Sequence, residues 1–383
     1  MSAARRPHRI VLLVCAAYLL YTLLTQGSDT RVFVTLGPCF AACSGAAECS
    51  IGPENGYDGQ FAYYIARDPQ NAAPCIDAPA YRYQRILLPI VGRILTLGFA
   101  PLIPLVFVAL NLLALVGSTA LLERLLVAQK ASPYYALAYG LFGGLVIAVR
   151  LSTPEPLAYG LVLLALWWGQ KSWAAPDEQR DDWRGRWGMP AALALAALAK
   201  ETTLIFAAAF ALYYAAGRHW GAALRVLLIT GLPFALWQLY LYSWLGTFGV
   251  GSGGAGGTPF EIIPFNGLWR IWTEGSFGAF VLLGGVALLV AALPALWGLV
   301  ASAREIVGAR LHTHVYAYLL FANAAVMLFV PFSTYREPLG ILRFIPGLVI
   351  AHVLYAALRF RGRRPLRYSL LWAITLLLPL ALR

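Results

Sequence analysis

The feature that most constrains this chain is a series of long apolar runs, which recurs from Ile10 to Leu382. A helix of about 17–25 apolar residues is long enough to cross a bilayer. The chain is 60% hydrophobic and only 12% charged, whereas soluble domains are about a quarter charged, and this excludes a water-soluble enzyme. We therefore predict an all-α polytopic membrane protein of about eleven transmembrane helices, whose long first outer loop carries short interfacial helices. The predicted spans are Ile10–Thr25, Pro101–Leu122, Pro133–Arg150, Glu155–Gln170, Gly188–Ala199, Thr202–Gly217, Ala222–Leu245, Gly278–Ser302, Thr313–Pro331, Leu339–Leu358 and Tyr368–Leu382.

The charge distribution fits such a topology. Arg5, Arg6 and Arg9 precede the first span and place the N-terminus in the cytoplasm by the positive-inside rule. This orientation puts 18 of the 29 basic and 6 of the 17 acidic residues inside, so the net charge of +12 lies on the inner face. The basic excess therefore indicates orientation in a membrane, and we expect no nucleic-acid partner. We predict a multi-pass protein of the plasma (inner) membrane, with the first span as an uncleaved signal-anchor.

The first outer loop, residues 26–84, holds four of the five cysteines: Cys39, Cys43, Cys49 and Cys75. An even number confined to one outward loop indicates two disulfides in an oxidising compartment. A metal site is the weaker alternative, because the loop has no Cys-x-x-Cys pair and no histidine. The sequence leaves the pairing open.

Asp58 lies in the same loop, in a Gly-Tyr-Asp-Gly turn that leads into a short aromatic helix ended by Pro69. Taken alone, such an aspartate is most often an N-cap or a turn former. Residues 82–98 predict an amphipathic interfacial helix with its arginines on the wet side. Arg93 would only anchor this helix to lipid head groups, whereas Arg82 and Arg85 lie next to the Asp58 segment.

Four more outward positions carry charge at the ends of spans. Glu155 follows Ser-Thr-Pro, where a first-turn carboxylate facing the helix dipole is the structural alternative. Lys200 interrupts an apolar stretch, and a single helix through it would bury a Lys–Glu pair near the bilayer centre. We therefore predict a hairpin of two short helices with Lys200 at the outer surface, where a snorkelling anchor is its alternative role. Arg336 and Arg343 complete the outward set.

A carboxylate among cations at a membrane edge suits a reaction on a lipid phosphate. The carboxylate can deprotonate an incoming hydroxyl or hold a divalent cation. The cations can stabilise the charge that grows on a leaving phosphate. The candidate catalytic residues, which would also be the ligands if a divalent cation is used, are Asp58 and Glu155. The candidate phosphate-binding residues are Arg82, Arg85, Lys200, Arg336 and Arg343.

The order of these features resembles the GT-C superfamily of integral membrane glycosyltransferases, which use polyprenyl-phosphate-linked sugars. The resemblance covers mainly residues 10–217: the early Asp58 and its aromatic helix, the interfacial helix, the acidic turn at Glu155 and the Ala-Lys-Glu-Thr motif at Lys200. It implies that Asp58 is the catalytic base, that Glu155 supports the acceptor or a metal, and that Lys200 lies near the donor phosphate. Two positions depart from the family pattern. Asp58 is followed by Gly rather than Glu, and Glu155 stands where Asp is commoner.

The resemblance and the residues together predict an inverting glycosyltransferase with its site on the outer face. Its partners would be a polyprenyl-phosphate-linked sugar donor, a glycan, lipid or protein acceptor, and membrane lipids. Residues 1–245 would form the catalytic transmembrane module, 246–277 a glycine-rich outer loop, and 278–383 the C-terminal transmembrane helices.

Two other functions are alternatives. A transporter or flippase for lipid-linked sugars predicts charges deep in the spans, which are nearly free of charge. A non-catalytic assembly subunit predicts that the cysteines are needed while Asp58 and Glu155 are replaceable.

Overall fold

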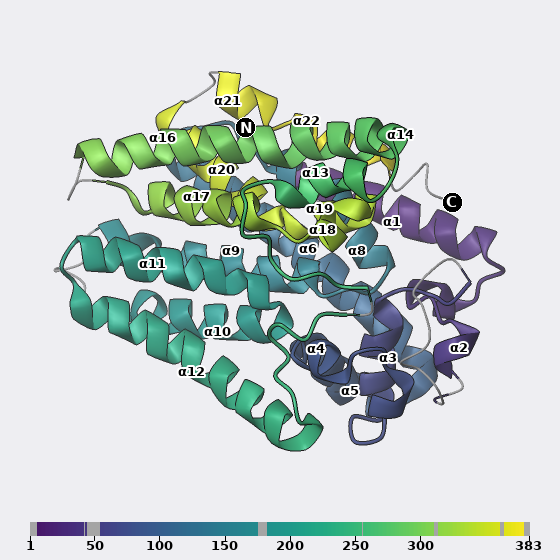
Figure 1. Cartoon of the computed structure of the whole chain (residues 1–383). Helices are drawn as coiled ribbons and strands as arrows, with labels where there is room; N and C mark the ends of the chain where they lie inside the picture. Colours follow the sequence, from purple (N-terminus) through teal and green to yellow (C-terminus); the bar gives the residue numbers. More distant parts are fainter. Residues whose placement is uncertain are drawn as a thin grey trace.

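The computed structural model describes residues 6–41, 43, 54–174, 182–254, 256–309, 313–360 and 364–378. This described part is helical and has no strand, only an isolated bridge between Leu36 and Gly56. The helices are α1 (Pro7–Thr25), α2 (Pro38–Ala41), α3 (Gly59–Arg67), α4 (Pro79–Tyr83), α5 (Leu87–Thr96), α6 (Ile103–Ala128), α7 (Leu137–Gly140), α8 (Gly143–Arg150), α9 (Glu155–Ala174), α10 (Met189–Ala199), α11 (Leu204–Ala216), α12 (Trp220–Leu245), α13 (Asn266–Thr273), α14 (Phe277–Ala279), α15 (Gly285–Ala287), α16 (Leu293–Ala309), α17 (Val315–Val326), α18 (Phe332–Arg336), α19 (Pro338–Phe344), α20 (Pro346–Arg359), α21 (Arg364–Tyr368) and α22 (Leu371–Ile374). Figure 1 shows the long helices packed side by side, with the short helices α2 to α5 gathered at one end of the bundle.

Four helical runs are long and apolar enough to cross a membrane: Pro7–Thr25, Ala100–Ala128, Trp220–Leu245 and Phe277–Gly308. Each is longer than the roughly 17 residues that a crossing needs. Large apolar side chains on these runs face outward, and Leu113 for example is 71% exposed. Such surfaces are unfavourable in water and suit contact with lipid. The membrane character expected from the composition is therefore present in the fold.

The other predicted spans lie on helices outside these four runs, and most of these helices are shorter or interrupted, although α9 is continuous over 20 residues. A total of eleven crossings therefore stays a prediction. The predicted span Pro133–Arg150 is divided between α7 and α8. At this break Gly143 lies against the carbonyl of Thr375, so closely that a Cβ would lie 2.2 Å from its oxygen. The helix is thus interrupted where the backbone at Gly143 packs closely against the backbone at Thr375.

Two predicted C-terminal spans are also interrupted. The predicted span Leu339–Leu358 is divided at Ile345, because Pro346 disfavours a helical backbone at the residue before it. In the predicted span Tyr368–Leu382, a short turn separates α21 from the four-residue α22. Residues 379–383 lie outside the described part of the chain.

The segment between α1 and α6 has its own apolar core, in which α3 packs against α5 and α6. Phe61 and Ile65 of α3 are both 1% exposed. A disulfide joins Cys43 to Cys75 across this segment. Cys39 is also disulfide-bonded, and Cys49 lies outside the described residues. The predicted use of cysteines as disulfides is confirmed for the pair that the structure describes.

The predicted interfacial helix 82–98 is two helices, α4 and α5, separated by a turn. Apolar side chains of α5 face outward, as expected at an interface, with Ile94 65% exposed. The expectation for its arginines was wrong, because Arg82 is only 8% exposed. Arg93 donates hydrogen bonds to the carbonyls of Ala66 and Arg67 at 3.1 and 2.6 Å. It thereby fixes the end of α3 instead of serving only as a lipid anchor.

The helical backbone is broken at Lys200. This residue is extended (φ −156°, ψ 119°), which ends α10, and α11 begins four residues later at Leu204. Lys200 pairs with Glu155, the first residue of α9.

The packing against α9 shows that α10 and α11 run in opposite directions. At the far end of α9, Trp173 stacks on Phe210 of α11, and Met189 at the start of α10 lies against Gly169. α11 is therefore parallel to α9 and α10 antiparallel to it (Figure 1). This is the predicted hairpin, and its position relative to a membrane stays a prediction.

Candidate functional site

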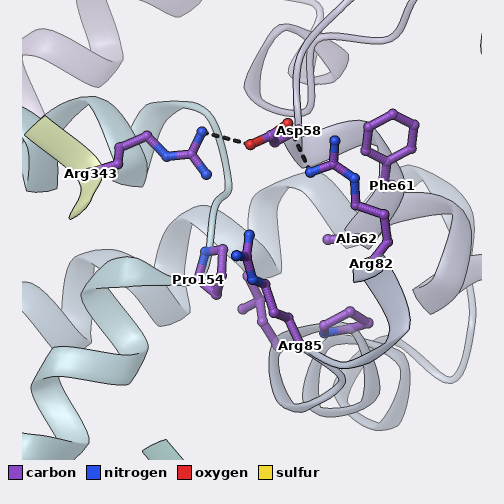
Figure 2. Close-up of a pocket in the computed structure, with 9 residues that line it drawn as sticks. Asp58, Phe61, Ala62, Arg82, Arg85, Pro154 and Arg343 are labelled. Carbon is purple, nitrogen blue, oxygen red and sulfur yellow. Dashed lines mark hydrogen bonds and ion pairs between the residues drawn. The ribbon is translucent and has the colours of Figure 1, made fainter. Parts of the chain in front are cut away.

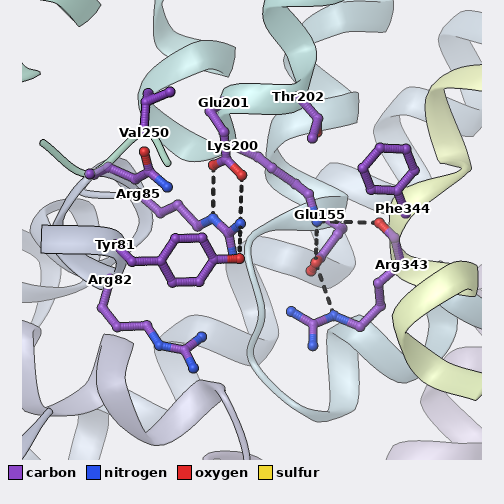
Figure 3. A network of polar contacts seen from close by, with 12 residues as sticks. Tyr81, Arg82, Arg85, Glu155, Lys200, Glu201, Thr202, Val250, Arg343 and Phe344 are labelled. Atoms are coloured by element: carbon purple, nitrogen blue, oxygen red, sulfur yellow. Dashed lines mark hydrogen bonds and ion pairs between the residues drawn. The ribbon is translucent and has the colours of Figure 1, made fainter. Parts of the chain in front are cut away.

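Six of the seven predicted site residues meet at one place (Figures 2 and 3). They come from distant parts of the chain, as shown by the 285 positions that separate the two partners Asp58 and Arg343. The helix ends and loops that supply them converge where α3, α4, α9, α10 and α19 meet. The six residues are Asp58 before α3, Arg82 in α4, Arg85 after it, Glu155 at the start of α9, Lys200 after α10 and Arg343 in α19.

Asp58 lies between two arginines. Its Oδ1 accepts a hydrogen bond from Arg82 Nη1 at 3.0 Å, and its Oδ2 accepts one from Arg343 Nη1 at 2.7 Å. Burial opposes ionisation, but the charges of Arg82 and Arg343 outweigh it and hold the pKa of Asp58 well below its usual range. Its side chain makes no capping hydrogen bond to α3, so it is not a simple N-cap. Asp58 is thus ionised and paired at neutral pH.

A second carboxylate fixes Arg82. The Nε and Nη2 of Arg82 both donate to Asp77 at 2.8 Å, which is the bidentate geometry that a guanidinium and a carboxylate favour. The same guanidinium lies 4.4 Å from the centre of the Phe61 ring. Arg82 therefore has a defined position beside Asp58. Asp77 was not predicted as a site residue, although it stands five residues before Arg82 and two residues before the start of α4.

Glu155 is fully buried and binds two cations through one oxygen. Its Oε1 accepts hydrogen bonds from Lys200 Nζ at 2.7 Å and from Arg343 Nε at 2.9 Å. Lys200 Nζ also donates to the carbonyl of Arg343 at 3.3 Å. Within the described part of the chain, Glu155 Oε2 has no hydrogen-bond partner. A buried carboxylate oxygen without a partner is costly, so this atom has the capacity to accept from a water or a substrate hydroxyl.

Arg85 is held by a residue that the sequence reasoning did not assign. Its Nε and Nη2 donate to the two oxygens of Glu201 at 2.9 and 2.6 Å, and Nη2 also donates to Tyr81 at 2.7 Å (Figure 3). Glu201 directly follows Lys200, so its place in the hairpin turn was the signal that could have identified it.

Arg336 makes none of these contacts. It is exposed and donates to the carbonyl of Gly256 at 3.4 Å. The predicted grouping of Arg336 with the phosphate-binding residues therefore has no counterpart in the network. It stands at the end of α18, one short helix before Arg343.

A pocket of about 30 Å³ lies beside Asp58. Figure 2 shows the guanidinium groups of Arg82, Arg85 and Arg343 pointing toward the space around this carboxylate. The wall includes apolar residues from α3 and α5 and a proline from the turn before α9. The residues that line it are Asp58, Phe61, Ala62, Arg82, Arg85, Leu88, Pro89, Pro154 and Arg343.

A divalent cation does not fit the two candidate carboxylates as they stand. Asp58 and Glu155 each accept hydrogen bonds from two cationic groups, and Arg343 is shared between them. Among the residues that the structure describes, no group of three His, Cys, Asp or Glu side chains is placed to hold a metal. A divalent cation held by Asp58 and Glu155 would therefore have to displace the cationic side chains that these carboxylates bind.

Comparison with known proteins gives no independent assignment. No protein-family model matches the chain, and neither does a curated protein or a solved structure. A functional assignment therefore has to rest on the residues and contacts of the site.

Proposed function

We propose that this protein is an inverting glycosyltransferase of the plasma membrane. It would move a sugar from a polyprenyl-phosphate donor to an acceptor hydroxyl at the outer face. The observation that carries the proposal is the convergence of Asp58 and Glu155 with four cations in one network, whose members Asp58, Arg82, Arg85 and Arg343 line a small pocket. Cations beside a carboxylate base are what the departure of a phosphate needs.

Two arginines have N–H groups left for a phosphate. Arg343 uses Nε and Nη1 for its contacts with the described residues, and Arg85 uses Nε and Nη2. Arg343 Nη2 and Arg85 Nη1 are therefore available, and both residues line the pocket. Guanidinium groups bind phosphate oxygens with strong, charge-assisted hydrogen bonds.

The walls of the pocket suit the rest of a lipid donor. Leu88 and Pro89 belong to α5, whose outer surface is apolar, so a prenyl chain can lie beside the phosphate. The pocket is too small for a whole sugar, and the glycine-rich loop lies against it. A Cβ at Gly254 would lie 3.1 Å from Arg82 Nη2. Displacement of this loop would make room for the sugar.

In the proposed reaction, Asp58 takes the proton of the acceptor hydroxyl as its oxygen attacks the anomeric carbon. The bond from that carbon to the phosphate oxygen breaks, and polyprenyl phosphate leaves with the bonding electrons. Asp58 is a weak base while both arginines pair with it. A donor phosphate bound by the remaining N–H groups of Arg343 and Arg85 would bring negative charge beside Asp58 and raise its pKa, so donor binding would activate the base.

Lipid mass spectrometry on cells that lack the protein tests this proposal. A glycosylated polyprenyl phosphate should accumulate in the null strain and in one complemented with Asp58→Asn, and wild type should clear it. Asp68→Asn is the matched control, because Asp68 is an exposed carboxylate of the same outer loop. The mass of the accumulated lipid identifies the donor sugar. Identical lipid profiles in the null and wild-type strains would contradict the proposal and favour an assembly subunit.

A further inference from the structure

Arg343 joins the two carboxylates that a divalent cation would have to join. Its Nη1 donates to Asp58 Oδ2 at 2.7 Å, and its Nε donates to Glu155 Oε1 at 2.9 Å. Mg²⁺ holds its oxygen ligands at about 2.0–2.1 Å, so the same oxygens cannot serve both cations in this arrangement. We propose that Arg343 takes the place of a divalent cation in this site and allows it to bind a phosphate without a metal.

The position of Arg343 is fixed by its surroundings. The residue is 7% exposed, and its Nη1 also donates to the Tyr57 hydroxyl at 3.0 Å. The backbone carbonyl of Arg343 accepts a hydrogen bond from Lys200 Nζ at 3.3 Å, which ties the backbone of α19 to the Lys200–Glu155 pair. Arg343 is thus a built-in part of the network rather than a mobile surface residue.

The charges of the network disfavour an additional cation. Every carboxylate in the network already accepts a hydrogen bond from a cationic side chain. The network has as many carboxylates as cationic side chains. A divalent ion between Asp58 and Glu155 would add two positive charges beside Lys200 and Arg343, which is unfavourable at such short range. The four carboxylates are Asp58, Asp77, Glu155 and Glu201, and the four cations are Arg82, Arg85, Lys200 and Arg343.

The pocket itself favours an anion. Its ionisable lining consists of the three arginines Arg82, Arg85 and Arg343 against the single carboxylate Asp58. A phosphate that enters it meets an excess of positive charge and the N–H groups left on Arg85 and Arg343. The choice of a lipid phosphate as this anion rests on the proposed function, whereas the exclusion of a metal rests on the contacts alone.

Manganese binding to the purified full-length protein tests the inference directly. The protein is freed of metal with EDTA, exchanged into EDTA-free buffer and titrated with Mn²⁺, and free Mn²⁺ is measured by electron paramagnetic resonance. Wild type should show no saturable Mn²⁺ site. Arg343→Ala should gain one site, because it frees Asp58 and Glu155, and the double variant Arg343→Ala/Asp58→Asn should lose it again. Arg359→Ala is the matched control, since it removes an arginine that pairs with Glu305 elsewhere.

Each outcome decides between the alternatives. One Mn²⁺ bound by wild type and lost in Asp58→Asn or Glu155→Gln would overturn the inference. Equal absence of binding in wild type and Arg343→Ala would show that Arg343 is not what excludes the metal, and would also overturn it. Arg343→Gln, which keeps most of the side-chain volume, replaces Arg343→Ala if that variant does not fold. Because this titration needs no sugar donor, its result is independent of whether the protein transfers a sugar.

Discussion

Replacing Asp58 with Asn should lower turnover about 10²–10⁴-fold, which is the usual contribution of a general base. Asparagine has nearly the same shape but cannot accept the proton of the acceptor hydroxyl. The loss should therefore appear in kcat. Binding of polyprenyl phosphate should survive, because Arg85 and Arg343, which line the pocket, remain in place. Single-turnover kinetics and a separate measurement of lipid binding would distinguish the two effects.

Asp68→Asn controls for the loss of a charge in the same loop. Asp68 is exposed, and its carboxylate contacts Asn71 outside the network. The turnover of the Asp68→Asn variant should match that of wild type. Near-normal turnover of Asp58→Asn would remove Asp58 from the mechanism, and a loss of lipid binding together with turnover would instead indicate a role in holding the arginines.

Replacing Glu155 with Gln should lower the free energy of unfolding by about 3–5 kcal/mol, the cost of leaving a buried charge without its partner. Glu155 is fully buried and supplies the counter-charge to both Lys200 and Arg343 through one oxygen. Glutamine preserves the shape and can still accept a hydrogen bond, so the effect isolates the charge. Thermal or denaturant unfolding of the purified protein in detergent measures it.

The partly exposed ion pair between Glu305 and Arg359 is the control for the buried pairs of Glu155. Arg359 has 41% of its side chain exposed, so Glu305→Gln should change stability by no more than about 1 kcal/mol. The double variant Glu155→Gln/Lys200→Met should recover part of the loss, because it removes one of the two unpaired cations. Equal costs for Glu155→Gln and Glu305→Gln would contradict the account of a buried network.

Some charged residues of the site could be predicted from the sequence, because burying their charge in lipid would be costly. Lys200 could not be placed inside a continuous helix without burying its charge in lipid, and the chain does turn there. Glu155 and Asp58 were assigned to the same side of the protein by topology alone. Their joint contact with Arg343 is consistent with that assignment.

The partners of these charges were harder to predict, because they depend on contacts between segments distant in sequence. Arg82 and Arg85 have a spacing that fits the wet face of a helix, yet both turn inward to Asp77 and Glu201. A periodicity argument gives the face of a helix but not the partner of a side chain. Arg336 was grouped with Arg343 by position in the chain, and only Arg343 reaches Asp58.

Helix breaks were missed inside long runs that are mostly apolar. Hydropathy does not distinguish one continuous helix from two that meet at an angle, so the runs around Gly143 and Ile345 were predicted as single spans. Pro346 was the available signal at the second break. At the first break the reason is the close approach of Gly143 to Thr375, which no local pattern reveals.

The central claim is transfer of a sugar from a lipid phosphate, and the most direct test is an assay of the purified protein in lipid vesicles. The lipid that accumulates in the null strain is supplied with a labelled sugar, and both products are followed. The account predicts release of polyprenyl phosphate in step with glycosylated acceptor, with inverted configuration at the anomeric carbon, and neither product with Asp58→Asn. An intact donor that only changes leaflet in the presence of wild-type protein would contradict it and identify a flippase.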